Sequence, residues 1–309
     1  MATIHTQQHT QSMLGAALVL LSAIAFSSKA VMVKLAYAYH VDVETLLVLR
    51  MAFAAPFYLA IAVWLYVSGK VEHLSRRDVV ALLLLGTLGG YLPMWLDFAG
   101  LAHVTAGLER VILFLYPTMV VLISAVLFGR AIVRHEVAAL LLSYVGVAMA
   151  AGGDVLAVGQ LTTETMLGAG LIFASALIYA GYLVASGKLI PRLGVLPFTA
   201  LIMLVASAAA TGHYLSMPHA AGLTGLPMEV YGIALLMAVV ATVLPSFMLS
   251  AGIQRVGSSR AAMLGMVGPV STIYLAYVYL GEGVGWLQLG GTALVMAGVF
   301  ALTAGRSAR

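Results

Sequence analysis

The chain has 309 residues, of which 62% are hydrophobic and 8% are charged, and its formal net charge is +4. Soluble domains contain roughly 25% charged residues, so this composition indicates an integral membrane protein. The absence of cysteine excludes disulfides and thiolate metal sites, and the basic residues lie mainly in short loops between apolar segments, which argues against nucleic-acid binding.

Ten apolar segments are long enough to cross a hydrocarbon core of about 30 Å. In chain order they lie near residues 13–33, 45–68, 79–98, 105–128, 135–152, 166–187, 195–216, 230–250, 257–280 and 286–304. No periodic strand pattern separates them, and lipid permits only helices or closed barrels as spanning structures. The sequence therefore predicts an all-α integral membrane bundle of ten transmembrane helices.

Proline and glycine landmarks recur along the chain at a constant offset of 152 residues: Pro93/Pro245, Gly100/Gly252, Pro117/Pro269, Gly129/Gly281, Gly146/Gly298 and Gly153/Gly305. A shared offset indicates a duplicated unit. Because each unit has an odd number of spans, the second starts on the opposite side of the membrane, and such inverted repeats are typical of transporters. We expect a first five-helix repeat over residues 1–153 and a second over residues 154–309, arranged around a central cavity.

The distribution of Lys and Arg predicts the orientation. We place the protein in the cell inner membrane with both termini in the cytoplasm. Most basic residues then fall in or beside inner connections, and Lys34 alone falls in an outer one. The outer connections near 153–165, 213–229 and 281–285 contain no Lys or Arg. This asymmetry follows the positive-inside rule.

Two symmetric prolines, Pro117 and Pro269, fall near the middle of the fourth and ninth spans. Each removes a backbone donor and frees the carbonyl four residues earlier, at Leu113 and Gly265. Interrupted segments at matching places in two repeats point to a binding site at the membrane midplane. A packing kink that only shapes the bundle is an equal alternative.

Charged residues within the spans belong to the first half of the chain: Lys29, Arg50, Asp97, Glu109 and Arg110. Each costs about 2.5 to 3.5 kcal/mol near the bilayer centre unless it is paired or hydrated. Arg50 is the candidate for holding an anionic group, because its planar guanidinium matches a carboxylate. The alternative is a structural pair with Asp97 or Glu109.

The other charges leave alternatives open. Lys29 either lines the cavity or extends outward to the membrane surface. Glu109 and Arg110 begin the fourth span, where a pair at the helix end is the favoured interpretation. Asp97 and Glu109 are also candidate proton or ion-pair sites.

Aromatic pairs supply candidate binding faces. Tyr91 and Trp95 are four residues apart, and Tyr179 and Tyr182 are three apart, so each pair shares one helix face. These faces either stack on a planar substrate or serve as interfacial anchors and core packing. Phe114 lies about one turn before Pro117 and is a further cavity candidate.

Two segments carry a resemblance to a known family: "LFLYPTMVVLISAVLFGR" in the first half and "MVGPVSTIYLAYVYLGEG" in the second. Their proline-centred helices and the Gly281-Glu282 exit resemble the drug/metabolite transporter superfamily and its EamA-type domains, while Gly129-Arg130 departs from that exit pattern. The resemblance implies a ten-helix transporter with its cavity between two four-helix bundles, and it matches a second-helix arginine of the family to Arg50. It also implies kinship with exporters of amino acids, including aromatic ones, and of other metabolites.

The sequence thus predicts a secondary transporter, not an enzyme, that exports small organic solutes by alternating access between inverted repeats. Amino acids are the favoured substrates. Arg50 or Lys29 would bind the carboxylate of the substrate, and a carbonyl freed near Pro117 or Pro269 would bind its amine. Aromatic rings would pack against its side chain: Tyr91, Phe114, Tyr179 and Tyr182. A nucleoside or other metabolite or drug exporter is the alternative, followed by a non-transporting sensor or assembly subunit. We expect no cofactor and no metal, with a small-molecule substrate and membrane lipid as partners, while the coupling ion and oligomeric state stay open.

Overall fold

The computed structural model describes residues 2–69, 74–127, 162–217 and 222–307, together with residues 137–138, 141–142, 144–150 and 152. The described residues form helices and no strands, which confirms the all-helical prediction. Within them, seven helices are long and apolar enough to cross a membrane. They are Met13–Tyr37, Val43–Val67, Arg76–Leu101, Ala106–Leu127, Thr163–Leu193, Val195–Ser216 and Met228–Val256.

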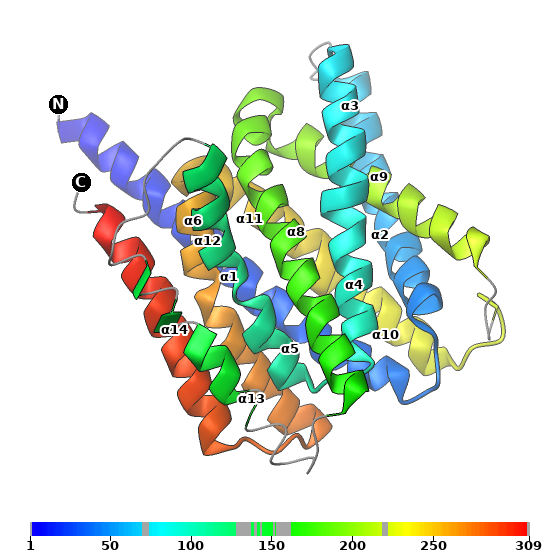
Figure 1. The fold of residues 1–309 in the computed structure, drawn as a ribbon. Coiled ribbons are helices and arrows are strands. Elements are labelled where there is room, and N and C mark those ends of the chain that lie inside the picture. The colour runs from blue at the N-terminus through cyan, green and yellow to red at the C-terminus, as the bar shows by residue number, and fades with distance from the viewer. Residues whose placement is uncertain are drawn as a thin grey trace.

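The α-helices are labelled in Figure 1. The first half contains α1 (Ala2–Tyr37), α2 (Val43–Val67), α3 (Arg76–Leu84), α4 (Leu92–Leu101), α5 (Ala106–Leu113) and α6 (Tyr116–Leu127). The second contains α8 (Thr163–Leu193), α9 (Val195–Ser216), α10 (Met228–Ala238), α11 (Leu244–Val256), α12 (Ser258–Leu264), α13 (Gly268–Leu280) and α14 (Trp286–Ser307). The expected fifth span, near 135–152, is described only in part, so the count of ten stays a prediction.

Two π-helical segments interrupt the long helices at equivalent positions of the two halves. The π-helical segment η1 (Leu85–Tyr91) joins α3 to α4 just before Pro93, and η2 (Val239–Val243) joins α10 to α11 just before Pro245. A proline inside a helix lacks an N–H group and clashes with the carbonyl four residues earlier, and a local π turn accommodates both defects. The third and eighth expected spans are therefore bent at the same point of each unit.

The midspan prolines break their helices, as their positions predict. On the first side α5 ends at Leu113 and α6 begins at Tyr116, one residue before Pro117. On the second side α12 ends at Leu264, the 3₁₀ turn η3 (Gly265–Val267) follows, and α13 begins at Gly268. The side chain of Pro269 lies outside the described residues.

Glycines allow two pairs of helices to touch through their backbones. A Cβ atom on Gly252 of α11 would stand 3.2 Å from the Gly15 carbonyl oxygen of α1, and a Cβ atom on Gly100 of α4 would stand 2.9 Å from the Gly168 carbonyl oxygen of α8. Such contacts leave no room for a side chain. They fix α1 against α11 and α4 against α8.

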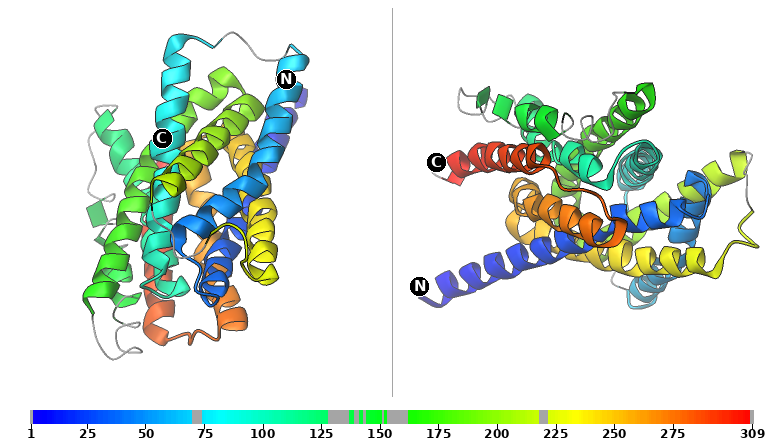
Figure 2. Two further views of the ribbon diagram at one scale, coloured as in Figure 1. Left: turned by 90° about the vertical axis from the view of Figure 1, so that its right-hand side faces the viewer. Right: turned by 90° about the horizontal axis from the view of Figure 1, so that it is seen from below.

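The remaining helices complete the bundle around these pairs. α2 packs against α9 and α10, while α8 also contacts α5 and α6. α14 lies along one side of the bundle, and the first part of α1 projects beyond it (Figures 1 and 2). The start of α1 and the end of α14 lie at the same end of the molecule.

Candidate functional site

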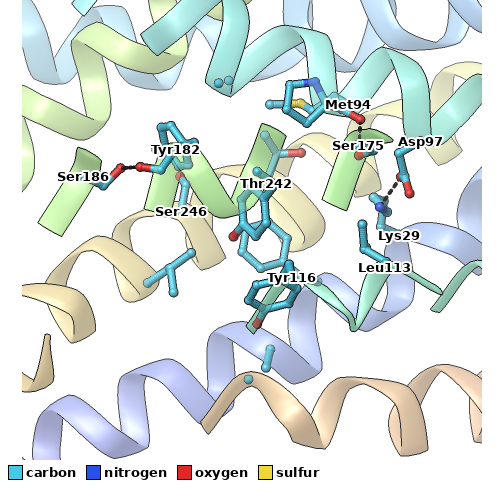
Figure 3. A pocket seen from close by; sticks show the side chains of 18 of the residues that line it. Lys29, Met94, Asp97, Leu113, Tyr116, Ser175, Tyr182, Ser186, Thr242 and Ser246 are labelled. Carbon is cyan, nitrogen blue, oxygen red and sulfur yellow. Dashed lines mark hydrogen bonds and ion pairs between the residues drawn. The ribbon is translucent and has the colours of Figure 1, made fainter. Parts of the chain in front are cut away.

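A cavity lies at the middle of the bundle, and the centres of water molecules can occupy about 170 Å³ of it. A single water needs about 10 to 15 Å³ on this measure, so the cavity has room for a small organic solute. Helices from both halves form the wall, including α1, α2, α4, α8, α9 and α11. Figure 3 shows Lys29 and Asp97 on one side of the view, Tyr182 and Ser186 on the other, and Thr242 and Tyr116 between them.

Lys29, Asp97 and Glu109 form an ion-pair cluster, which we call the acid–lysine cluster. The Lys29 Nζ donates to Asp97 Oδ2, and it lies 3.4 Å from Glu109 Oε1. The side chains of Lys29, Asp97 and Glu109 are 13%, 3% and 0% exposed. Because both carboxylates converge on one ammonium, Lys29 is turned inward, not outward toward the membrane surface.

Arg50 extends from α2 into the wall and is 2% exposed. Its Nε donates to Thr242 Oγ1 at 2.6 Å, and its guanidinium carbon stands 5.3 Å from the centre of the Phe98 ring. Its Nη1 is buried without a hydrogen-bond partner. Arg50 forms no ion pair with Asp97 or Glu109, the alternative expected from the sequence. Both carboxylates pair with Lys29 instead.

Arg110 differs from the sequence expectation. The helix-end interpretation placed it with Glu109 at the membrane interface, but both side chains are buried, at 5% and 0% exposure. Arg110 Nε donates to Thr272 Oγ1 at 2.8 Å and Nη2 donates to the Phe26 carbonyl at 3.0 Å. The reason is that Thr105 starts α5 outside the cavity, so the next turn already lies inside the bundle.

Aromatic rings cover one side of the cavity. Tyr116 meets Tyr179 edge to face at 5.3 Å between ring centres, Tyr179 stacks on Tyr182 at 5.9 Å, and Phe114 meets Tyr116 at 5.5 Å. All four residues line the cavity. This set includes the expected Phe114, Tyr179 and Tyr182, and it adds Tyr116.

The two midspan prolines act through their neighbours. Pro117 is not among the described residues of the wall, but Leu113 and Gly265 are, and these are the residues whose carbonyls the prolines free. The interruptions thus lie next to the cavity in both halves.

Tyr91 is a correction to the expected site. Its hydroxyl bonds to His213 Nδ1, and the Trp95 ring also packs edge-on against His213, at 5.3 Å between ring centres. Tyr91 is absent from the cavity wall. The ring points to α9, which carries His213.

Sequence reasoning missed the hydroxyl groups that the second half contributes. Thr242 and Thr272 accept from the two arginines, and the wall also includes a set of neutral polar side chains: Ser175, Ser186, Thr199, Ser246 and Ser250. Serine and threonine are frequent in membrane helices, where they bond to nearby carbonyls. Their sequence pattern alone therefore gives no signal of a site.

A carboxylate from the second half anchors the start of α5. Glu282 follows α13 and accepts from the backbone N–H groups of Ala106 at 3.0 Å and Gly107 at 3.2 Å. These N–H groups have no partner within the helix, and the positive end of the helix dipole favours a carboxylate there. The contact holds α5, and with it Glu109 and Arg110, against the second half.

Known proteins resemble this chain in sequence and in fold. Residues 13–152 and residues 166–304 each match the EamA-like transporter family. A protein of Bacillus subtilis (strain 168), described as "Uncharacterized transporter YcbK", is 31% identical over 292 residues, which span 92% of this chain and 92% of that protein. A solved crystal structure, described only as that of a protein, has a TM-score of 0.66 at 18% identity and covers 94% of this chain and 96% of that one. At such identity the last comparison concerns the fold alone.

Proposed function

Because this chain belongs to the EamA-like transporter family, we propose that it is a secondary transporter that exports small organic solutes, with amino acids, aromatic ones included, as the favoured substrates. The transport cycle is alternating access between two inverted repeats of five helices, in the cell inner membrane with both termini in the cytoplasm.

The helix directions support the inverted arrangement. α1 opens the first matched segment and α8 the second, and they run in opposite directions through the bundle (Figure 1). The contacts repeat as well: Ser22 Oγ on α1 donates to the Pro245 carbonyl at 3.0 Å, and Ser175 Oγ on α8 donates to the Pro93 carbonyl at 2.7 Å. Two copies of one unit related by inversion account for both observations.

The observation that carries the proposal is the cavity with Arg50 in its wall. A buried guanidinium with an unpaired Nη1 retains a donor for a carboxylate, and charged hydrogen bonds of this kind are strong. The ring set of Phe114, Tyr116, Tyr179 and Tyr182 supplies an apolar surface for the rest of the solute.

Transport by purified protein in liposomes tests the proposal. We expect Arg50→Ala to lower the flux of carboxylate-bearing solutes by about tenfold or more, since a charged hydrogen bond contributes about 1.5 to 3 kcal/mol. Arg50→Lys keeps the charge but loses the planar fork, so its flux should lie between the two. Arg255→Ala, an exposed arginine of α11, is the matched control. Wild-type flux in a well-folded Arg50→Ala protein would exclude the carboxylate role.

A nucleoside exporter is the second candidate, and one observation favours it. The stacked Tyr179 and Tyr182 rings line the cavity and offer a surface on which a planar base can stack, and Phe198 packs behind Tyr182 at 6.4 Å between ring centres. Competition for transport between uncharged nucleosides and amino acids separates the two candidates, because the carboxylate contact matters only for the second.

A further inference from the structure

The charges around the cavity do not balance. Lys29, Arg50, Asp97 and Arg110 line it, and Glu109 lies behind the wall in contact with Lys29. With all five side chains ionised, the three cations exceed the two carboxylates by one positive charge. This count covers the described residues of the wall and their ion-pair partners.

The excess resides on the arginines. Lys29 is held by both carboxylates, whereas Arg50 donates to the Thr242 hydroxyl and Arg110 to the Thr272 hydroxyl and the Phe26 carbonyl. These acceptors are neutral. Within the described part of the chain, neither arginine forms an ion pair.

The same arrangement leaves little for an ammonium group. Asp97 is the sole acid among the described residues of the wall, and its Oδ2 already accepts from Lys29. Its Oδ1 exposes less than 1 Å² and has no partner. A zwitterion would therefore find its carboxylate site, but an amine paired with the free Oδ1 of Asp97 would lie beside the Lys29 ammonium and be repelled by it.

Burying an unpaired charge is unfavourable, and a ligand of opposite charge relieves that cost. A solute with a single negative charge balances the cavity, while a zwitterion leaves the excess unchanged. The chain's own Lys29 ammonium already occupies the position that a substrate amine would need.

Resting on the proposed role as an exporter of carboxylate-bearing solutes, but replacing amino acids as the favoured substrates, we propose that the cavity selects organic monocarboxylates of net charge −1 that lack a charged amine, such as 2-oxo and 2-hydroxy acids with an apolar side chain. The carboxylate pairs with Arg50. The side chain lies against the tyrosine rings.

A matched series of solutes tests this selection on the unmodified protein. Phenylalanine, phenylpyruvate and 3-phenyllactate share one skeleton and differ at the α-carbon, and leucine with its 2-oxo acid repeats the comparison without a ring. In counterflow from proteoliposomes, we expect the anions to exceed the matched zwitterions by about tenfold, the effect of one charged hydrogen bond left unpaired.

The outcomes separate the two proposals. Zwitterions moving as fast as the anions, or faster, would overturn the charge selection and leave the carboxylate transporter intact. If a nucleoside moves while neither the anions nor the zwitterions do, the carboxylate role and the charge selection both fail. If no solute of any class moves, transport itself is refuted.

Lys29→Met offers a second readout, because it removes one positive charge and frees both carboxylates for a substrate ammonium. We expect the phenylalanine-to-phenylpyruvate flux ratio to rise by about tenfold, and Lys188→Met, an exposed lysine of α8, to leave the ratio unchanged. If Lys29→Met does not yield monodisperse protein, Asp97→Asn replaces it and should lower the ratio. An unchanged ratio in the folded variant contradicts the proposal.

Discussion

The two halves of the cavity wall differ in chemistry although they share one scaffold. The first half contributes every charged side chain of the described wall, whereas the second contributes its serine and threonine hydroxyls, and both contribute aromatic rings. Two matching hydrogen bonds join the halves here, each from an arginine Nε of the first to a threonine hydroxyl of the second: Arg50 to Thr242 and Arg110 to Thr272. Duplication therefore explains the framework, while the substrate chemistry comes from residues that the repeat does not share.

The largest effect should come from breaking the acid–lysine cluster of the first half. Lys29→Met leaves Asp97 and Glu109 buried without a cation, and removing one partner of a buried ion pair costs about 3 to 5 kcal/mol. We expect the free energy of unfolding in detergent to fall by this order. The triple variant Lys29→Met, Asp97→Asn, Glu109→Gln should recover much of the loss, and a triple variant less stable than the single one would contradict the ion-pair account.

The two threonines of the second half give the next test, because each accepts a hydrogen bond from an arginine of the first half. Thr242→Val and Thr272→Val keep the side-chain shape but leave the Nε of Arg50 or Arg110 without its acceptor, at a cost of about 1 to 3 kcal/mol for an unsatisfied buried group. Chemical unfolding should show similar losses for both. Flux of carboxylate solutes should fall further for Thr242→Val, and an equal fall for both would argue against a special role for Arg50.

A smaller effect is expected where the halves are joined outside the cavity. Glu282→Ala removes the carboxylate that caps α5, and losing such a cap costs about 0.5 to 2 kcal/mol. Thermal unfolding measures the loss. Glu164→Ala, in the exposed first turn of α8, is the matched control, and a loss as large there as at Glu282 would mean that the bond to α5 is not the cause.

The smallest effect should come from the exposed ion pair between α8 and α3. Arg192 Nη2 lies 3.0 Å from Asp78 Oδ2, but the arginine side chain is 61% exposed. Exposed pairs gain little because water screens them. Arg192→Ala should leave the melting temperature unchanged within error, in contrast to Lys29→Met. A clear drop would show that this exposed ion pair contributes to stability as the buried cluster does.

The framework could be predicted because it depends on local rules. Pro117 interrupts a helix wherever it stands inside one, and the repeated Gly100 and Gly252 mark close helix contacts by lacking a Cβ atom. Apolar length likewise predicts the spans. These features need no knowledge of which helices are neighbours.

The partners of the charges could not be predicted, because they depend on helices far apart in the chain. Arg50 meets Thr242 across 192 positions. Lys29 meets Asp97 across 68. Tyr91 lies outside the cavity wall for the same reason: helix periodicity places it on a face with Trp95, but that face meets His213, which lies 122 positions away in the chain.

The glycine contacts have a consequence for movement. α1 touches α11, and α4 touches α8, at positions where no side chain separates the backbones. Each pair joins one helix from either copy of the gene-duplicated unit. Any displacement that preserves these contacts must carry α1 together with α11, and α4 together with α8. A rigid body that kept either contact would therefore contain helices from both copies, and its boundary would not follow the boundary between the copies.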